Sequence, residues 1–312
     1  MSKDRIIWVD NLKALGILSV ILGHIQSPYG FFIFSWHMPL FFFISGFFIK
    51  FNKSIKEFIT DDFKRLMIPY FLLSIFGLII ESIKRSLIST ESIDYLYEFK
   101  GIFIYMDYPH LMNTYGFILW FLPALFFARL LVYLLNMKIE SIFIQFIIVL
   151  CLFYFSFSFD TFFGIDNSLN SIIFIFLGTI YYRLYQNEKI LYLLLFILPV
   201  LILYFGVPAL NMASKDYENI FINVSYAISI IFILVKLLQK MKFENRLVRL
   251  WGENTMLLFI IHPYTNHIGH IFFGNEVLFG NWHLKLIVSL VILQCVLYVK
   301  LKFINRGIFK YV

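Results

Sequence analysis

The sequence predicts an all-α, polytopic membrane protein that forms a single domain over residues 1–312. Two observations predict this class. First, 61% of the residues are hydrophobic and only 14% are charged, whereas a soluble domain carries about 25% charged residues. Second, the mean hydropathy is +0.82 and the chain contains 40 phenylalanines. No polar segment is long enough to form a separate soluble domain.

Ten apolar stretches are predicted to cross the membrane as helices. Each is close to the length of about 20 residues that a helix needs to span a bilayer. Turn-forming or charged residues separate one stretch from the next, which favours separate helices. The predicted spans are 7–26, 31–50, 66–83, 114–135, 141–158, 170–185, 190–206, 219–237, 254–272 and 284–304.

Lysine and arginine residues are distributed unequally along this arrangement. If the N-terminus is cytoplasmic, nineteen of the 26 lie in inner loops or at inner helix ends and five lie in outer loops. The remaining two, Lys13 and Arg129, lie within predicted spans. Because positively charged loops are retained in the cytoplasm, we expect both termini to be cytoplasmic in a multi-pass protein of the inner or plasma membrane. The same loops, next to membrane lipids, account for the net charge of +7, so no nucleic-acid partner is predicted.

The first predicted helix carries ionisable groups where lipid would exclude them. Asp10, Lys13 and His24 interrupt an apolar run. At about 100° per residue, Asp10 and His24 lie within roughly 40° of each other, and Lys13 lies within roughly 60° of Asp10. Lys13 and His24 are about 16 Å apart along the axis, half the thickness of a bilayer. Ionisable groups inside a membrane helix face the protein interior or an aqueous cavity, so this face is predicted to be functional.

Several segments resemble the acyltransferase-3 family of integral membrane acyltransferases. The first is a basic residue followed, after ten residues, by a histidine, here Lys13 and His24. WHMPLFFFISGFF (Trp36 to Phe48) is similar to the second-helix signature of that family. LWFLPALF (Leu119 to Phe126) and GENTMLLFIIHP (Gly252 to Pro263) follow in the family's order. The resemblance covers almost the whole chain and is nearest to the fucose 4-O-acetylase-like branch.

The resemblance implies a membrane-bound O-acyltransferase, in this branch an O-acetyltransferase. Its expected donor is cytoplasmic acyl-coenzyme A, in particular acetyl-CoA. Its expected acceptor is a sugar hydroxyl of a surface polysaccharide or lipid-linked glycan in the cell envelope. Direct transfer is the expected mechanism, and an acetyl-histidine intermediate is the alternative. The sequence contains no GxSxG motif, so it does not support a serine acyl-enzyme.

His24, His37 and Asp10 form the predicted catalytic group. A neutral imidazole can take a proton from an alcohol and return it to a leaving thiolate, and the resemblance assigns this role to His24. The alternative is that His24 only forms hydrogen bonds between helices. His37 lies in the first half of the second span and could orient His24, bind the acceptor or share protons. Asp10 is three residues before Lys13, so it is expected to pair with that lysine.

Four residues are predicted to bind the donor. Lys13 and Arg65 lie toward the cytoplasm and are expected to contact coenzyme A phosphates. The family often has arginine at the position of Lys13, and lysine lacks its bidentate fork. Arg129 lies in the fourth span and needs an anionic partner, for which Glu81 or a ligand phosphate could serve. Trp120, nine residues before Arg129 on the same face, is expected to line the acyl cavity.

Trp36 and His262 are predicted to contact the acceptor. Trp36 could stack on a sugar ring or could belong to an interfacial aromatic belt. His262 lies mid-membrane before Pro263, which removes a helix hydrogen bond and frees a carbonyl group. No metal site is predicted. His267 and His270 have i, i+3 spacing, but no carboxylate shares that helix turn.

The longest outer segment, 84–113, is too polar to span a bilayer but is rich in aromatic residues. It is expected to lie on the membrane surface or to cap a cavity. Its aromatic and imidazole side chains are Tyr95, Tyr97, Tyr105, Tyr108 and His110.

Two other functional classes are compatible with charged membrane helices. A transporter of a polysaccharide or an acyl group would use the charges as a permeation path, but the internal repeats that favour this class are absent from the sequence. A metal-histidine sensor would bind metal stoichiometrically. Acyl-coenzyme A hydrolysis or transfer by the purified protein distinguishes the enzyme from both.

The predicted topology can be tested by labelling single cysteines in a variant that lacks the native cysteines. We expect cysteines placed at Lys53 and Arg246 to be protected from an impermeant thiol reagent added outside the cell. A cysteine placed at Asn211 should react. Labelling of the opposite sidedness would refute the placement of the donor site in the cytoplasm.

Overall fold

The computed structural model describes residues 6–88, 92–184, 188–241, 243–274 and 280–303. Within these residues the chain is helical except for loops and one hairpin of two-residue strands, β1 (Leu210–Asn211) and β2 (Asp216–Tyr217). The α-helices are α1 (Ile7–Gly23), α2 (Gly30–Phe34), α3 (His37–Gly46), α4 (Ile55–Asp62), α5 (Ile68–Ile88), α6 (Tyr95–Lys100), α7 (Tyr108–Leu111), α8 (Phe121–Lys138), α9 (Ile142–Phe155), α10 (Ile165–Leu184), α11 (Glu188–Phe205), α12 (Ile220–Met241), α13 (Arg246–Glu253), α14 (Thr255–Phe273) and α15 (Trp282–Lys302). Short π and 3-10 segments are Phe63–Met67, Gly101–Tyr105, Tyr115–Trp120 and Phe162–Gly164.

An all-α membrane protein is confirmed in its main features. Each of the ten predicted spans coincides with helical structure. Within the described residues, five helical segments are long and apolar enough to cross a membrane: Ile55–Ile88, Tyr115–Lys138, Phe162–Tyr181, Ile220–Met241 and Trp282–Lys302. The count of ten crossings and the cytoplasmic placement of both termini stay predictions.

The predicted span 31–50 is wrong as a single helix. It is divided into α2 and α3, and the backbone at Trp36 between them is not helical, with φ −145° and ψ −19°. Pro39 explains the division, because it has no N–H to donate to the carbonyl group of Ser35 four residues earlier. His37 is therefore the first residue of a new helix and does not lie in the middle of a continuous one.

The third predicted span begins earlier than expected. A helical segment runs from Ile55 to Ile88 through a π turn at Phe63–Met67. Ser54 and Glu57 form a capping box at its start, which satisfies two free backbone N–H groups. Arg65 lies on the π turn and lines the same cavity as Lys13 of α1.

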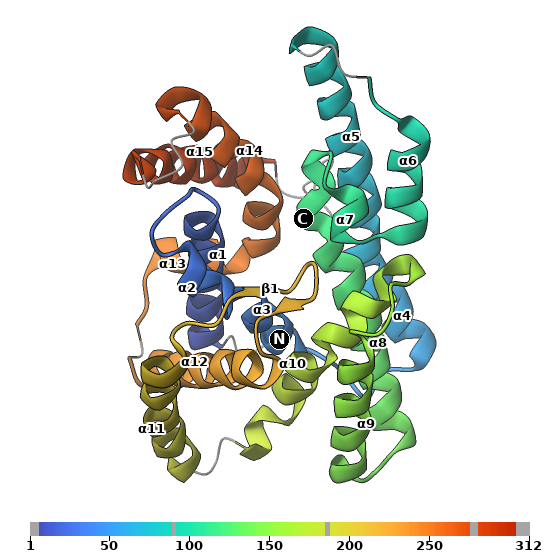
Figure 1. Ribbon diagram of the computed structural model, residues 1–312, viewed down its shortest axis with the longest axis vertical. Helices are drawn as coiled ribbons and strands as arrows, with labels where there is room; N and C mark the ends of the chain where they lie inside the picture. The colour runs from blue at the N-terminus through green and yellow to red at the C-terminus, as the bar shows by residue number, and fades with distance from the viewer. Residues whose placement is uncertain (1–5, 89–91, 185–187, 242, 275–279, 304–312) are drawn as a thin grey trace.

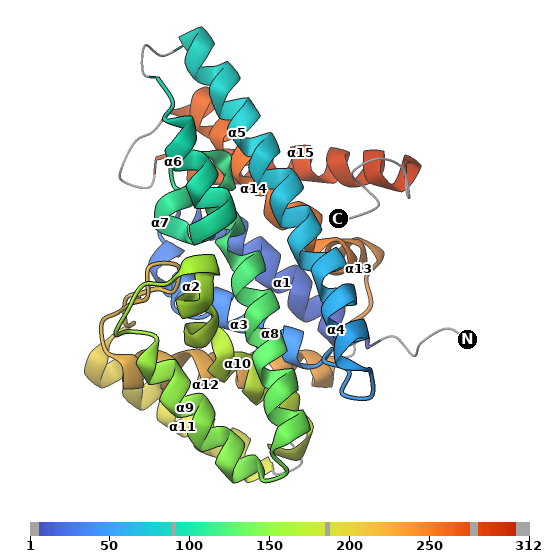
Figure 2. The same cartoon turned by 90° about the vertical axis from the view of Figure 1, so that its right-hand side faces the viewer.

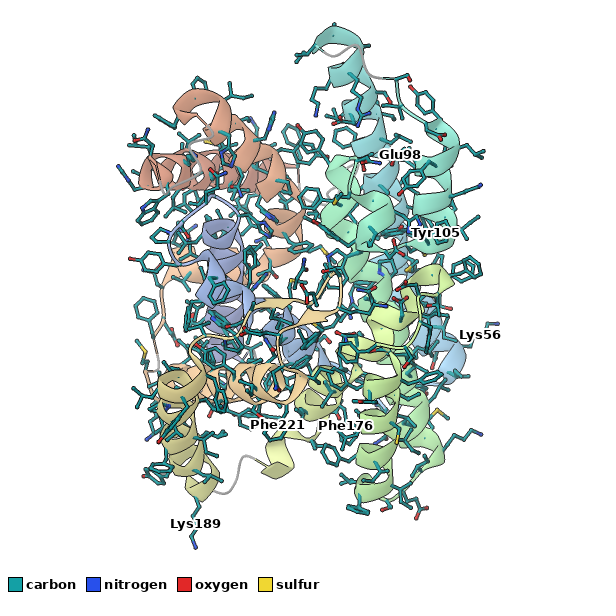
Figure 3. All side chains as sticks on the ribbon, in the orientation of Figure 1. Lys56, Glu98, Tyr105, Phe176, Lys189 and Phe221 are labelled. Atoms are coloured by element: carbon teal, nitrogen blue, oxygen red, sulfur yellow. The ribbon has the colours of Figure 1, made fainter. Side chains whose placement is uncertain are left out.

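The helices that carry the candidate site lie in the middle of the molecule. Figure 1 shows α1 among α12 to α15 and α3 near the centre, with α5 to α9 on the other side. In Figure 2, α4 and α13 lie on one side of the molecule, and α2, α6 and α7 lie on the opposite side. Charged side chains such as Lys56 and Lys189 extend away from the ribbon in Figure 3, whereas Phe176 lies among the helices and is buried.

Glycine residues allow the central helices to approach one another at backbone distance. A side chain at Gly178 of α10 would overlap the carbonyl oxygen of Phe43 in α3, and one at Gly46 would overlap that of Ile175. Small residues at such crossings are typical of membrane helices, where close packing replaces the hydrophobic driving force. This crossing fixes α3, and with it His37, against α10.

We expect Gly178→Ala to destabilise the protein by roughly 1–3 kcal/mol, because the added methyl group has no space beside the Phe43 carbonyl oxygen. Thermal unfolding in detergent would measure the loss. Gly269→Ala is a matched control, since its methyl group would lie 3.4 Å from Lys285, an ordinary contact distance. Equal stability of the two variants would contradict this account of the crossing.

Candidate active site

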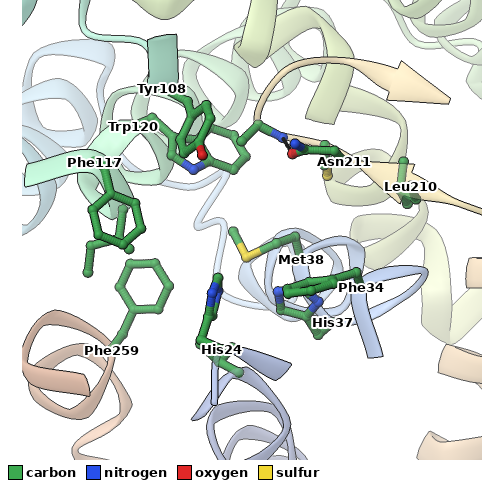
Figure 4. A pocket seen from close by; sticks show the side chains of 14 residues that line it. His24, Phe34, His37, Met38, Tyr108, Phe117, Trp120, Leu210, Asn211 and Phe259 are labelled. Atoms are coloured by element: carbon green, nitrogen blue, oxygen red, sulfur yellow. Dashed lines mark hydrogen bonds between the residues drawn. The ribbon is translucent and has the colours of Figure 1, made fainter. Parts of the chain in front are cut away.

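His24 and His37 line the same cavity, which has a volume of about 290 Å³ and is called the histidine cavity below. Figure 4 shows the two imidazoles and Met38 on one side of it, opposite Tyr108 and Trp120. The remaining lining residues are Val20, Phe34, Phe117, Ile118, Leu210, Asn211, Met212, Ala213 and Phe259. His24 follows the last residue of α1, and His37 is the first residue of α3. The break at Ser35 and Trp36 therefore brings both imidazoles to one cavity.

Aromatic contacts hold the imidazole of His24 in place. The ring of Phe34 lies 5.2 Å from the ring of His24 and 5.3 Å from that of His37, measured between centroids. On another side, the centroid of His262 lies 5.3 Å from that of His24. His262 is buried in α14 and is absent from the cavity lining. His24 is therefore positioned between the cavity and a second imidazole.

The ring orientations of His37 and His262 are set by backbone carbonyl groups. Nδ1 of His37 is 2.9 Å from the oxygen of Ile33, and Nδ1 of His262 is 2.6 Å from the oxygen of Phe259. A carbonyl oxygen can only accept, so each Nδ1 carries the proton in these bonds and each Nε2 of a neutral ring has a free lone pair. Within the described residues, Nε2 of His262 has no hydrogen-bond partner.

The outer wall of the histidine cavity is a firmly anchored loop. Asn211, Met212 and Ala213 of the β1–β2 hairpin line the cavity, and Asn167 donates a hydrogen bond to the carbonyl oxygen of Ala213 at 2.9 Å. Lys215 of the hairpin pairs with Asp166 at 2.7 Å and with Asp160 at 2.8 Å. These contacts fix the three lining residues over the cavity.

The charge of Lys215 is maintained by these two acids. Burial alone would lower the pKa of Lys215, but its hydrogen bonds to Asp160 and Asp166 outweigh burial and raise the pKa above its usual value. The ion pairs that anchor the hairpin are therefore intact at neutral pH.

A second group of residues lines two further cavities that share several wall residues. The middle cavity, of about 270 Å³, is lined by Lys13, Arg65 and Arg129 together with mostly apolar side chains. The same three cations also line a larger opening of about 600 Å³, called the basic recess below. The other residues of the basic recess are Phe47, Phe48, Lys50, Lys53, Phe58, Asp61 and Asp62. The structure thus brings together the three basic residues that the sequence predicted to bind the donor.

The middle cavity and the histidine cavity share one wall. Phe259 lines both of them, and its ring lies 5.5 Å from that of Phe121, measured between centroids. Trp120 lines the histidine cavity and not the middle cavity, and its place in the wall of an acyl cavity stays a prediction. The basic recess, the middle cavity and the histidine cavity therefore follow one another. The rings of Phe121 and Phe259 lie between the middle cavity and the histidine cavity.

The anionic partner of Arg129 is Asp62. Nε of Arg129 donates to Oδ2 of Asp62 at 2.6 Å, and one terminal nitrogen donates to the carbonyl oxygen of Ser45 at 2.6 Å. The predicted alternative, Glu81, is wrong. Glu81 forms ion pairs with Lys84 at 2.7 Å and Arg85 at 2.9 Å, within one turn of its own helix, which leaves it no role for a distant arginine.

Asp10 and Trp36 lie outside the histidine cavity. Asp10 is buried and lies 3.8 Å from Lys13, whereas it is fourteen residues, or about 21 Å along the helix, from His24. The structure therefore places Asp10 where it can position Lys13 but not touch the same atoms as His24. Trp36 is also buried, and its Nε1 has no hydrogen-bond partner among the described residues. Its indole packs against Phe32 with centroids 6.2 Å apart.

Several site residues were not identified from the sequence. Lys50 and Lys53 of the basic recess are two of them, because lysines after an apolar run indicate membrane topology and not a binding site. Phe259 precedes His262 by three residues, so its position on the same helix face was available as a signal. Asn211 lies in the β1–β2 hairpin, where the sequence has no motif or periodicity that points to a site. The predicted cap from segment 84–113 is present in part, since Tyr108 lines the histidine cavity.

Possible metal ligands are scattered in the part of the chain that the structure describes. That part contains no group of three or more histidine, cysteine, aspartate or glutamate residues arranged to hold a metal ion.

Comparison with known proteins gives one clear result. Searches of curated proteins and of solved structures find no match. A family model described as an acyltransferase domain matches residues 6–300, which includes the helices that carry every residue of the three cavities. The chain therefore belongs to the acyltransferase-3 family, and the protein is a membrane acyltransferase.

Proposed function

We propose that this protein is an O-acetyltransferase of the inner or plasma membrane. It takes the acetyl group of acetyl-coenzyme A from the cytoplasm and transfers it to a sugar hydroxyl of a surface polysaccharide or lipid-linked glycan on the other side. One observation carries the proposal. A basic recess, a largely apolar middle cavity and a cavity with two histidines are connected in series by shared wall residues.

The basic recess has the charge that the donor requires. Lys13, Lys50, Lys53 and Arg65 line it, and the phosphate groups of coenzyme A are recognised by such cations through charge-assisted hydrogen bonds. Arg129 already donates to Asp62 and Ser45, but the guanidinium group has five N–H donors. These bonds use three of the five donors, and Arg129 adds its positive charge to the recess that it lines.

The distance between the two ends fits a long, thin donor. Lys13 and His24 are about 16 Å apart along α1, and the middle cavity between them is lined mainly by apolar side chains such as Phe41, Leu125 and Met256. An extended pantetheine arm has the shape for this passage. The thioester would then reach the pair Phe121 and Phe259, at the border of the histidine cavity.

The chemistry at the far end requires a base and a proton donor in turn. His24 accepts the proton of the sugar hydroxyl while the hydroxyl oxygen bonds to the thioester carbonyl carbon. The carbon–sulfur bond then breaks, and the departing thiolate takes the proton back from His24. No net proton is gained or lost, which suits an imidazole that begins and ends neutral.

The walls of the histidine cavity are suited to a sugar ring. Tyr108, Phe117 and Trp120 offer aromatic faces, and Asn211 adds an amide group at the outer side. Aromatic faces with a few polar groups are typical of sites that bind rings with both apolar faces and hydroxyl groups. The resemblance to the fucose 4-O-acetylase-like branch supports the same class of acceptor.

Replacing His24 tests the catalytic assignment. We expect His24→Gln to reduce transfer by about 10²–10⁴-fold, because glutamine keeps a hydrogen bond but cannot accept the proton. Transfer of radiolabelled acetyl groups from acetyl-CoA to glycan acceptors measures the rate, and donor binding by the purified variant is the control. Near-native transfer by His24→Gln would show that His24 is structural.

Replacing Lys13 tests the donor site. We expect Lys13→Ala to raise the KM for acetyl-CoA by about 10-fold or more, since a charge-assisted hydrogen bond contributes roughly 1.5–3 kcal/mol. The KM for the acceptor should not change. Lys138→Ala is the matched control, because Lys138 is an exposed lysine at the end of the helix that carries Arg129 and lies outside the recess. An unchanged KM in Lys13→Ala would remove this residue from the donor site.

A further inference from the structure

We propose that His262 is a positioning residue that fixes the tautomer of His24. Its Nε2 accepts a hydrogen bond from the ring N–H of His24 through one bridging water molecule, so that the unprotonated nitrogen of His24 faces the cavity. This inference rests on the proposed role of His24 as the base. It assigns to His262 a role different from acceptor binding.

The tautomer of His262 follows from the local sequence. Pro263 has no N–H, so the carbonyl group of Phe259 lacks its usual helix partner four residues later. That carbonyl oxygen accepts the Nδ1 proton of His262 at 2.6 Å. The order of residues Phe259, His262 and Pro263 therefore places the proton on Nδ1 and leaves a lone pair on Nε2.

The lone pair of His262 needs a donor, and His24 is the adjacent imidazole. His262 is 1% exposed, and its Nε2 has no partner among the described residues. A buried acceptor without a partner costs about 1–3 kcal/mol. The two rings are tilted by 38° with centroids 5.3 Å apart, a separation that a single bridging water molecule can span.

The arrangement gives the two nitrogens of His24 different roles. A neutral imidazole has one N–H, and a bond to His262 places it on the side away from the cavity. His37, whose Nδ1 proton is held by Ile33, also presents only a lone pair and cannot block the free nitrogen of His24 by donating to it. After His24 accepts the hydroxyl proton, both of its ring nitrogens carry a proton. The proton directed at His262 stays in place, so the proton that came from the hydroxyl group is the one returned to the thiolate.

The experiment compares kcat and KM of the full-length protein and three variants. His262→Leu removes the acceptor, and we expect kcat to fall about 10- to 100-fold while the KM for acetyl-CoA is unchanged. His262→Gln offers an amide oxygen in place of Nε2, so it should recover part of the lost rate. His267→Leu is the matched control, because His267 is on the same helix but exposed and contacts Tyr115; its kcat should equal that of the wild type.

A fourth variant keeps the imidazole and changes only its partner. Pro263→Ala restores an N–H that competes for the Phe259 carbonyl oxygen, so kcat should fall without a change in KM. This variant also tests the proposal if His262→Leu fails to fold. Wild-type kcat in Pro263→Ala, or equal losses in His262→Leu and His262→Gln, would overturn the inference.

The outcomes also separate this inference from the proposed function. If His24→Gln is inactive while His262→Leu has wild-type kcat, His24 is the base and His262 has no positioning role. If His24→Gln is fully active, the proposed mechanism fails and the inference fails with it.

Discussion

The buried ion pair between Arg129 and Asp62 is the interaction on which the walls of the basic recess depend. A guanidinium group that is 1% exposed cannot remain charged in a membrane without an anionic partner. Asp62 supplies the charge and the carbonyl oxygen of Ser45 supplies a further acceptor. One side chain thus joins α4, α8 and the end of α3. Breaking such a pair by removing one partner typically costs 3–5 kcal/mol, so it fixes the walls of the basic recess.

The two ends of the candidate site are built on different principles. At the inner end, cations surround an open recess and are held by ion pairs such as Lys13 with Asp10. At the other end, the imidazoles of His37 and His262 donate to backbone carbonyl groups. Pro263 follows His262 and removes an N–H that would otherwise compete for the carbonyl group of Phe259, whereas Pro39 follows His37 by two residues and frees the carbonyl group of Ser35, which is not the partner of His37. The basic recess thus presents charged side chains, whereas backbone carbonyl groups fix the tautomers of His37 and His262 beside the histidine cavity.

Much of the fold could be predicted because membrane helices leave a strong local signal. Apolar length alone located helices at all ten predicted ranges. The pairing of Lys13 with His24 on one helix face required only the helix period. The break at Trp36 was missed, since the apolar run continues through it and the proline that causes it lies three residues later.

The remaining site residues could not be predicted because they depend on contacts between distant segments. Arg129 and Asp62 are 67 residues apart in the chain, and no local pattern favours Asp62 over Glu81 as the partner. Asn211 reaches the histidine cavity through a hairpin that is anchored by Lys215 and Asp166. The contact of His262 with His24 joins α14 to the end of α1, two segments that are far apart in the sequence. Such pairings arise from the packing of the whole domain.

The aromatic wall of Phe121 and Phe259 has a consequence for the cell that is independent of acyl transfer. Cavities that follow one another through a membrane protein threaten the ion gradients across that membrane, since a continuous water column would conduct protons and small cations. Two phenylalanine rings 5.5 Å apart leave no polar group to replace the hydration shell of an ion, and narrow apolar constrictions exclude water. The same rings therefore form an apolar barrier to ions between the middle cavity and the histidine cavity.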